Sequence, residues 1–173
     1  MTDVEWLDLV DERDEVIGSV TREEAWARRL PVRGVNAFLV NSRGELWIPR
    51  RTLIKRMFPG CLDMSVGGHV DRGETYEAAF RRETQEELNL DVDALPWREI
   101  GAFTPQDAGL NIFMRVYELC TDTAPTYNPH DFSGAEWLTP AALLARIAAG
   151  DLAKSDLAPL IRLCYGEGPE KRP

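Results

Sequence analysis

"GHVDRGETYEAAFRRETQEELNL", which runs from Gly68 to Leu90, is the stretch of this chain that decides the fold. Its pattern from Thr75 to about Leu88 predicts a helix. Three glutamates, Glu83, Glu86 and Glu87, fall within five positions of that helix. Like charges at such spacings repel one another, so crowding them lowers stability unless something positive lies between them. We therefore expect a cation near these three glutamates, either from another side chain or as a bound ion.

On a helical wheel, the apolar stripe of this helix continues into carboxylates. Five residues fall within roughly 80° of one another, namely Tyr76, Phe80, Glu83, Glu87 and Leu90. The apolar members predict that this stripe faces the interior. Buried or half-buried carboxylates must be paired, protonated or bound to a metal.

The nearest cations, Arg81 and Arg82, are expected on the other side of the wheel, whereas Glu86 lies on the flank of the carboxylate face. Hard divalent ions such as magnesium prefer oxygen ligands. The three glutamates therefore predict a magnesium site. The alternative is a solvated acidic helix, in which Arg82 and Glu86 form an exposed ion pair of little consequence.

Gly67 and Gly68 join a predicted strand to this helix. They allow the backbone to turn tightly or to approach a ligand closely, and Gly68 can present its carbonyl to a metal. The chain contains neither a Walker A sequence nor a GxGxxG fingerprint, so the usual phosphate-binding loops are absent from the sequence.

Gly68, Glu74 and the run Arg82-Glu83-x-x-Glu86-Glu87 are separated by five and by seven residues. This spacing resembles the Nudix box, GX5EX7REUXEEXGU, where U is a bulky aliphatic residue, and all six fixed charged or glycine positions up to the last glutamate match. Thr84 replaces the first U, and Asn89 replaces the late glycine. Asparagine tolerates the left-handed conformation that ends helices. We expect Thr84 to loosen packing beneath the helix without touching the carboxylates.

The resemblance implies an α/β/α sandwich with a mixed β-sheet, in the α/β (α+β) class, and a loop-helix-loop formed by the box. It implies a single Nudix hydrolase domain over residues 1–173, with the box at 68–90. Hairpin and capping patterns predict a hairpin and a short helix at about 4–30, and helices at about 140–166. These hairpins favour a mixed or antiparallel sheet over a doubly wound parallel one.

The resemblance also implies roles for individual residues. Glu83 and Glu87 would be the principal magnesium ligands, Glu86 would act as ligand or base, and the Gly68 carbonyl would complete the shell. Manganese could replace magnesium. Arg82 and Glu74 would form a structural ion pair that fixes the loop against the helix. The reaction implied is hydrolysis of a small diphosphate, with nucleoside di- or triphosphates as the preferred class.

Outside the box, the stretch "ELWIPRRTLIKRMFPG" resembles the Nudix branch that contains isopentenyl-diphosphate isomerase and its hydrolase-like relatives. In that branch the stretch supplies cations for the diphosphate. Arg51 and Lys55 match, and Arg50 lies beside them. The resemblance therefore implies that these three residues bind substrate.

The two alternatives to a hydrolase are an isopentenyl-diphosphate isomerase and a module that only binds diphosphate. The isomerase uses a cysteine just before "GH", where this chain has Gly67, and two upstream histidines, whereas this chain has only His69 and His130. A catalytically silent diphosphate-binding module is the other alternative. Retention of every box carboxylate weighs against it, because a module that only binds could lose one.

Composition narrows the remaining choices. A net charge of −9 argues against binding to a nucleic-acid polymer. Three scattered cysteines indicate a reducing, cytoplasmic setting, and the first residues show neither a secretion signal nor a membrane span. Both a monomer and a homodimer are compatible with the sequence. Four aromatic residues are candidates for a surface that stacks on a nucleobase, although each also suits a core position. They are Trp47, Phe58, Phe103 and Trp137.

Overall fold

The computed structural model describes residues 4–107, 110 and 112–166, so the ends of the predicted domain, 1–3 and 167–173, lie outside the described residues. Strands and helices interleave along the chain in the order β1 (Trp6–Val10), β2 (Val16–Thr21), α1 (Arg22–Arg28), β3 (Arg33–Val40), β4 (Leu46–Arg51), β5 (Val66–His69), α2 (Tyr76–Leu88), the 3₁₀ helix η1 (Val92–Ala94), β6 (Trp97–Phe103), β7 (Phe113–Cys120), β8 (Phe132–Leu138), α3 (Pro140–Ala148) and α4 (Leu157–Tyr165). No helix among these residues is long and apolar enough to cross a membrane.

A six-stranded sheet forms the centre of the fold. Its strands follow the order β6-β7-β3-β4-β8, and β5 pairs with β3 outside this path. β3 and β7 run parallel, while the other pairs are antiparallel. The predicted mixed sheet is therefore confirmed.

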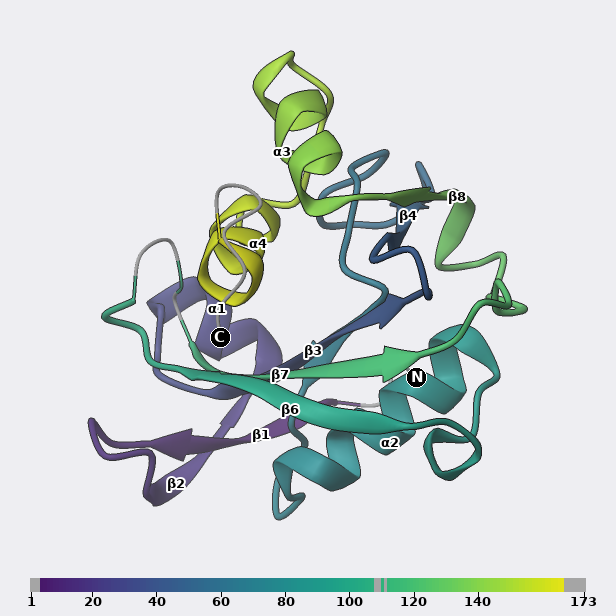
Figure 1. Ribbon diagram of the computed structural model, residues 1–173. Coiled ribbons are helices and arrows are strands. Elements are labelled where there is room, and N and C mark those ends of the chain that lie inside the picture. Colours follow the sequence, from purple (N-terminus) through teal and green to yellow (C-terminus); the bar gives the residue numbers. More distant parts are fainter. Residues whose placement is uncertain (1–3, 108–109, 111, 167–173) are drawn as a thin grey trace.

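Helices cover both faces of this sheet, which makes it the middle layer of a sandwich (Figure 1). Successive residues of β3 point to opposite faces because the side chains of a strand alternate. Val35, Ala37 and Leu39 pack in one core cluster with Phe80 of α2. Phe38 belongs to a second cluster together with residues of α3 and α4. The predicted α/β/α sandwich is confirmed.

The N-terminal hairpin fixes the loop that leads into α2. β1 and β2 pair antiparallel, as predicted. The backbone N–H of Arg72 donates to the Trp6 carbonyl at 2.9 Å, and the N–H of Gly73 donates to Asp8 Oδ2 at 2.9 Å. These bonds hold the loop against β1, so the start of the helix has a fixed position.

Both ends of α2 follow from local sequence. Thr75 caps the start, because its hydroxyl accepts a bond from the N–H of Ala78 at 3.1 Å. Asn89 ends the helix in the left-handed conformation with φ 53°, as the substitution for glycine predicts. Thr84 is fully buried, and its hydroxyl donates to the Phe80 carbonyl at 2.7 Å. Its polar atom is thus satisfied inside the core.

Loss of the Thr75 cap gives a test of this local structure. We expect Thr75→Ala to lower the free energy of unfolding by about 1 kcal/mol, because one N–H at the start of α2 loses its acceptor. Thr75→Ser keeps the hydroxyl and should stay close to wild type. Urea unfolding of the three proteins measures the difference, and equal stability of Thr75→Ala and wild type would contradict the cap.

Candidate metal and diphosphate site

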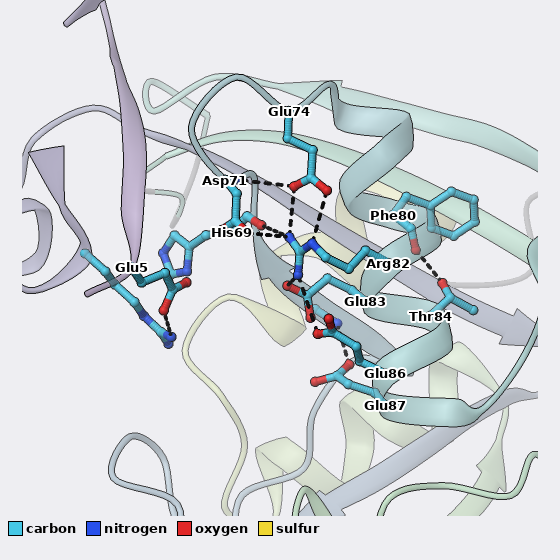
Figure 2. Close-up of polar contacts among 12 residues, drawn as sticks. Glu5, His69, Asp71, Glu74, Phe80, Arg82, Glu83, Thr84, Glu86 and Glu87 are labelled. Carbon is cyan, nitrogen blue, oxygen red and sulfur yellow. Dashed lines mark hydrogen bonds and ion pairs between the residues drawn. The ribbon is translucent and has the colours of Figure 1, made fainter. Parts of the chain in front are cut away.

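The predicted site lies where β5 meets the second half of α2. Figure 2 shows Glu83, Glu86 and Glu87 projecting from the same side of the helix, beside the loop that carries Glu74. Their exposure differs. Glu83 has 14% of its side chain exposed, whereas Glu86 has 59%. Glu83 and Glu87, the two glutamates of the predicted stripe, are partly buried, whereas Glu86, which was expected on the flank of that face, is exposed.

Arg82 connects this loop to the glutamates. Its guanidinium donates two bonds to the Glu74 carboxylate, at 3.0 and 2.9 Å, and one to the His69 carbonyl at 3.0 Å. It also donates to Glu83 Oε1 at 2.7 Å and lies 3.5 Å from Glu86 Oε2. The ion pair with Glu74 that the box resemblance implies is present (Figure 2).

The expectation that Arg82 points away from the carboxylates is wrong. A helical wheel shows only the direction in which a side chain leaves the helix axis. The long, flexible side chain of arginine can bend toward the next residue along the helix. Arg81 does point away, and it pairs with Glu77 and Asp93 instead. The positive partner of Glu83 in this structure is therefore a neighbour on the helix.

The two glycines of β5 approach the glutamates closely. The N–H of Gly67 donates to Glu87 Oε2 at 3.0 Å. A β-carbon at Gly68 would lie 2.0 Å from Glu83 Oε1, well inside contact distance. Only glycine therefore lets the Glu83 carboxylate lie against the β5 backbone.

Burial shifts the acidity of both inner glutamates. It raises the pKa of Glu83 to about 7, although the bond from Arg82 acts in the opposite direction. Burial, together with the charges of Asp63 and Glu83, raises the pKa of Glu87 well above its ordinary value. Negative charge is thus disfavoured at both positions unless a cation compensates it.

The donor chemistry of this site fits a hard divalent cation. The side chains are carboxylates, and the nearest backbone is that of two glycines, so every available ligand atom is an oxygen. Within the described part of the chain, however, no three His, Cys, Asp or Glu side chains are already arranged around one metal position. The Glu83 carboxylate accepts a hydrogen bond from Arg82, and the Glu87 carboxylate accepts one from the Gly67 N–H. A metal would have to replace at least one of these bonds.

Two of the three predicted diphosphate cations lie in ion pairs near Glu87. Arg51 donates to Asp63 Oδ2 at 2.6 Å, and Lys55 pairs with Asp131. The charges of Asp63 and Asp131 both contribute to the raised pKa of Glu87, so both ion pairs lie within electrostatic range of this carboxylate. Arg50 differs, because its guanidinium bonds Asp151 at 3.0 Å through both carboxylate oxygens.

Three of the four aromatic candidates do not form a common wall. Trp47 is buried in the core against Tyr127 and Phe132, and Trp137 packs on the same cluster. Phe103 packs on the other side of the sheet. A core role therefore accounts for these three residues.

Sequence reasoning missed Asp63 and Lys154. Asp63 is 7% exposed and accepts a bond from Arg51, while Lys154 Nζ lies 3.7 Å from Asp63 Oδ1. Neither residue belongs to a motif. The only sequence signal was a charged residue, Asp63, inside the mostly apolar run "CLDMSV", since a charged residue in a buried segment must be paired.

Comparison with known proteins gives concordant matches. A family model described as the NUDIX domain matches residues 30–160. A Nudix hydrolase of Deinococcus radiodurans is 60% identical over 163 residues, which are 94% of this chain and 95% of that protein.

Solved structures match as well. The crystal structure of DR0079 from Deinococcus radiodurans superposes with a TM-score of 0.89 at 59% identity, covering 93% of this chain and 99% of that one. The dihydroneopterin triphosphate pyrophosphohydrolase of E. coli superposes with a TM-score of 0.54 at 20% identity, covering 76% of this chain and 92% of that one. The second match shows a common fold.

Proposed function

Because this chain belongs to the Nudix family and is a hydrolase of that family, we propose that it is a magnesium-dependent pyrophosphohydrolase. Its proposed substrates are nucleoside di- or triphosphates, and manganese could substitute for magnesium. The proposal includes a single hydrolase domain in a cytoplasmic protein, and the three free cysteines suit that setting.

The observation that carries this proposal is the pair of partly buried carboxylates, Glu83 and Glu87, held against the backbone of Gly67 and Gly68. Their raised pKa values indicate a site in which a divalent cation relieves unfavourable charge. We assign Glu83 and Glu87 as its principal ligands, with the Gly68 carbonyl completing the shell.

A bound divalent ion would neutralise diphosphate oxygens and lower the pKa of a bound water. The protein's own residues orient these partners. Arg82 fixes the Glu74 loop and holds the Glu83 carboxylate in place. Glu86 is the most exposed of the three box glutamates, which suits a base that exchanges protons with water. Positioning and electrostatics supply most of the rate in such phosphoryl chemistry.

Arg51 and Lys55 are proposed to bind the diphosphate, which is the feature that links this chain to the isomerase-like branch. Both are paired with carboxylates beside Glu87 and could exchange that partner for a phosphate. Arg50 was assigned the same role from sequence, and its bidentate pair with Asp151 supports a structural role instead.

A specific contact favours hydrolysis over isomerisation. A β-carbon at position 67 would lie 2.6 Å from Asn36 Oδ1, so the isomerase cysteine does not fit unless Asn36 moves. A protein of the same fold is named as a pyrophosphohydrolase of dihydroneopterin triphosphate.

The test is a substrate panel. The protein is incubated with magnesium and nucleoside di- and triphosphates, nucleotide sugars, dinucleoside polyphosphates or isopentenyl diphosphate, and phosphate release and isomer formation are followed. We expect metal-dependent release from a nucleotide. Isomer formation without release would overturn the hydrolase proposal, and binding without turnover across the panel would favour a silent diphosphate-binding module.

A further inference from the structure

Lys154 lies beside the carboxylate face although it is far from the Nudix box in sequence. It belongs to a short segment that pairs with the chain just before β5. Leu62 forms a parallel bridge with Ala153, the N–H of Leu62 donates to the Leu152 carbonyl at 2.8 Å, and the N–H of Lys154 donates to the Leu62 carbonyl at 2.9 Å. The base of the lysine side chain is therefore held in a fixed position.

The ammonium group reaches Gly67. Lys154 Nζ lies 3.8 Å from the place where a β-carbon of Gly67 would stand, and the same glycine donates its N–H to Glu87. The charge of Glu87 also acts on Lys154. Lys154 and Glu87 thus flank one residue, which puts a cation at the edge of the proposed metal site.

The hydrogen-bonding capacity of this ammonium is unused. Its nearest carboxylate oxygens are Asp63 Oδ1 at 3.7 Å and Asp156 Oδ2 at 3.8 Å, and Nζ donates no hydrogen bond to any residue that the structure describes. An ammonium has three donors, so this group can accept a ligand oxygen as a hydrogen-bond partner. Only 20% of this side chain is exposed, so water access is limited.

The other cations around the site are already bonded. Arg82 donates to Glu74 and Glu83, and Arg51 donates to Asp63. A phosphate that contacts either of them must compete with a carboxylate at hydrogen-bonding distance. Lys154 can donate to a phosphate oxygen without breaking any hydrogen bond, because the distances in its two ion pairs are longer than a hydrogen bond.

We propose that Lys154 binds a non-bridging phosphate oxygen of the substrate, on the side of the metal site formed by Gly67. Lysine acts toward phosphate as a compact point charge with several donors, which suits a phosphate oxygen that it can meet from more than one direction. This inference rests on the proposed diphosphate chemistry and adds a binding residue from outside the box.

Calorimetric titration with methylenediphosphonate in the presence of magnesium tests the contact without turnover. In Lys154→Met, the Kd should rise about 10- to 100-fold, as expected when one charge-assisted hydrogen bond is lost. The matched control is Arg43→Met, which removes the same charge from the β3–β4 turn, where the arginine side chain is 68% exposed and bonds Glu45. The control should bind like wild type.

An unchanged Kd in a Lys154→Met protein that unfolds at the wild-type temperature would overturn the proposal, and so would an equal rise in the control. If Lys154→Met does not fold, the wild-type protein serves instead. Reductive methylation followed by mass spectrometry should then show that methylenediphosphonate and magnesium slow the labelling of Lys154. A labelling rate that the ligand leaves unchanged would overturn the contact.

The two proposals fail in different ways. A wild-type protein that binds methylenediphosphonate through Lys154 but hydrolyses no nucleotide would leave this inference standing and remove the proposed function. A Lys154→Met protein that hydrolyses nucleotides as well as wild type, with unchanged Kd, would do the reverse.

Discussion

Replacing Glu87 by glutamine is expected to reduce metal-dependent hydrolysis roughly a thousandfold while the protein stays folded. The side chain keeps its shape and can still accept the bond from the Gly67 N–H. It loses the negative charge that a divalent cation requires, and charge stabilisation by such an ion supplies several kcal/mol at the transition state, which corresponds to about three powers of ten in rate. We expect Glu83→Gln to reduce metal-dependent hydrolysis in the same way.

Stability separates this prediction from simple unfolding. Burial holds the pKa of Glu87 well above its ordinary value, so its negative charge destabilises the metal-free fold. Glu87→Gln should therefore melt no lower than wild type without metal, and magnesium should raise its melting temperature less than it raises that of wild type. Thermal unfolding with and without magnesium measures both effects.

Glu77→Gln is the matched control for these variants. Glu77 lies in the first turn of the same helix, its side chain is 55% exposed, and it pairs with Arg81. This variant should keep wild-type turnover and the full magnesium effect. A folded Glu83→Gln or Glu87→Gln protein with wild-type activity would remove these residues from the site.

Replacing Arg82 by methionine is expected to lower both stability and activity. The variant loses four hydrogen bonds, to Glu74, Glu83 and the His69 carbonyl, and it leaves two half-buried carboxylates without their cation. Breaking a buried pair destabilises by about 3–5 kcal/mol; because 27% of the Arg82 side chain is exposed, we expect about 2–3 kcal/mol after solvent screening. Thermal unfolding should show a melting temperature lower by about 5–10 °C.

Activity of Arg82→Met should fall at temperatures where the protein is still folded, because the Glu74 loop and the Glu83 carboxylate lose their common anchor. Arg81→Met is the control, since Arg81 pairs with exposed acidic groups on the other side of α2. Its stability should change less, and its turnover should match wild type. Equal losses in the two variants would contradict the anchoring role of Arg82.

Much of the fold could be predicted because its signals are local. The period of apolar residues and the residues Thr75 and Asn89 define α2, and the structure confirms both ends. The hairpin patterns predicted the mixed sheet, since a short polar turn leaves antiparallel pairing as the only close return of the chain. The spacing from Gly68 to Glu87 resembles the Nudix box, and the match of the NUDIX family model confirms the family. Helix geometry predicted only that the glutamates share a face.

The sequence by itself thus determined the helix, the sandwich and the Nudix carboxylates. Only the tertiary structure decided which cations reach them. Arg82 bends toward Glu83 while it is also hydrogen-bonded to Glu74 in the preceding loop. Lys154 reaches Gly67 only because the segment around Ala153 pairs with Leu62. The Lys154 contact joins segments far apart in the chain, and the Arg82 contact depends on how a long side chain bends. Local periodicity carries no information about either, because it describes only the positions of residues along one element.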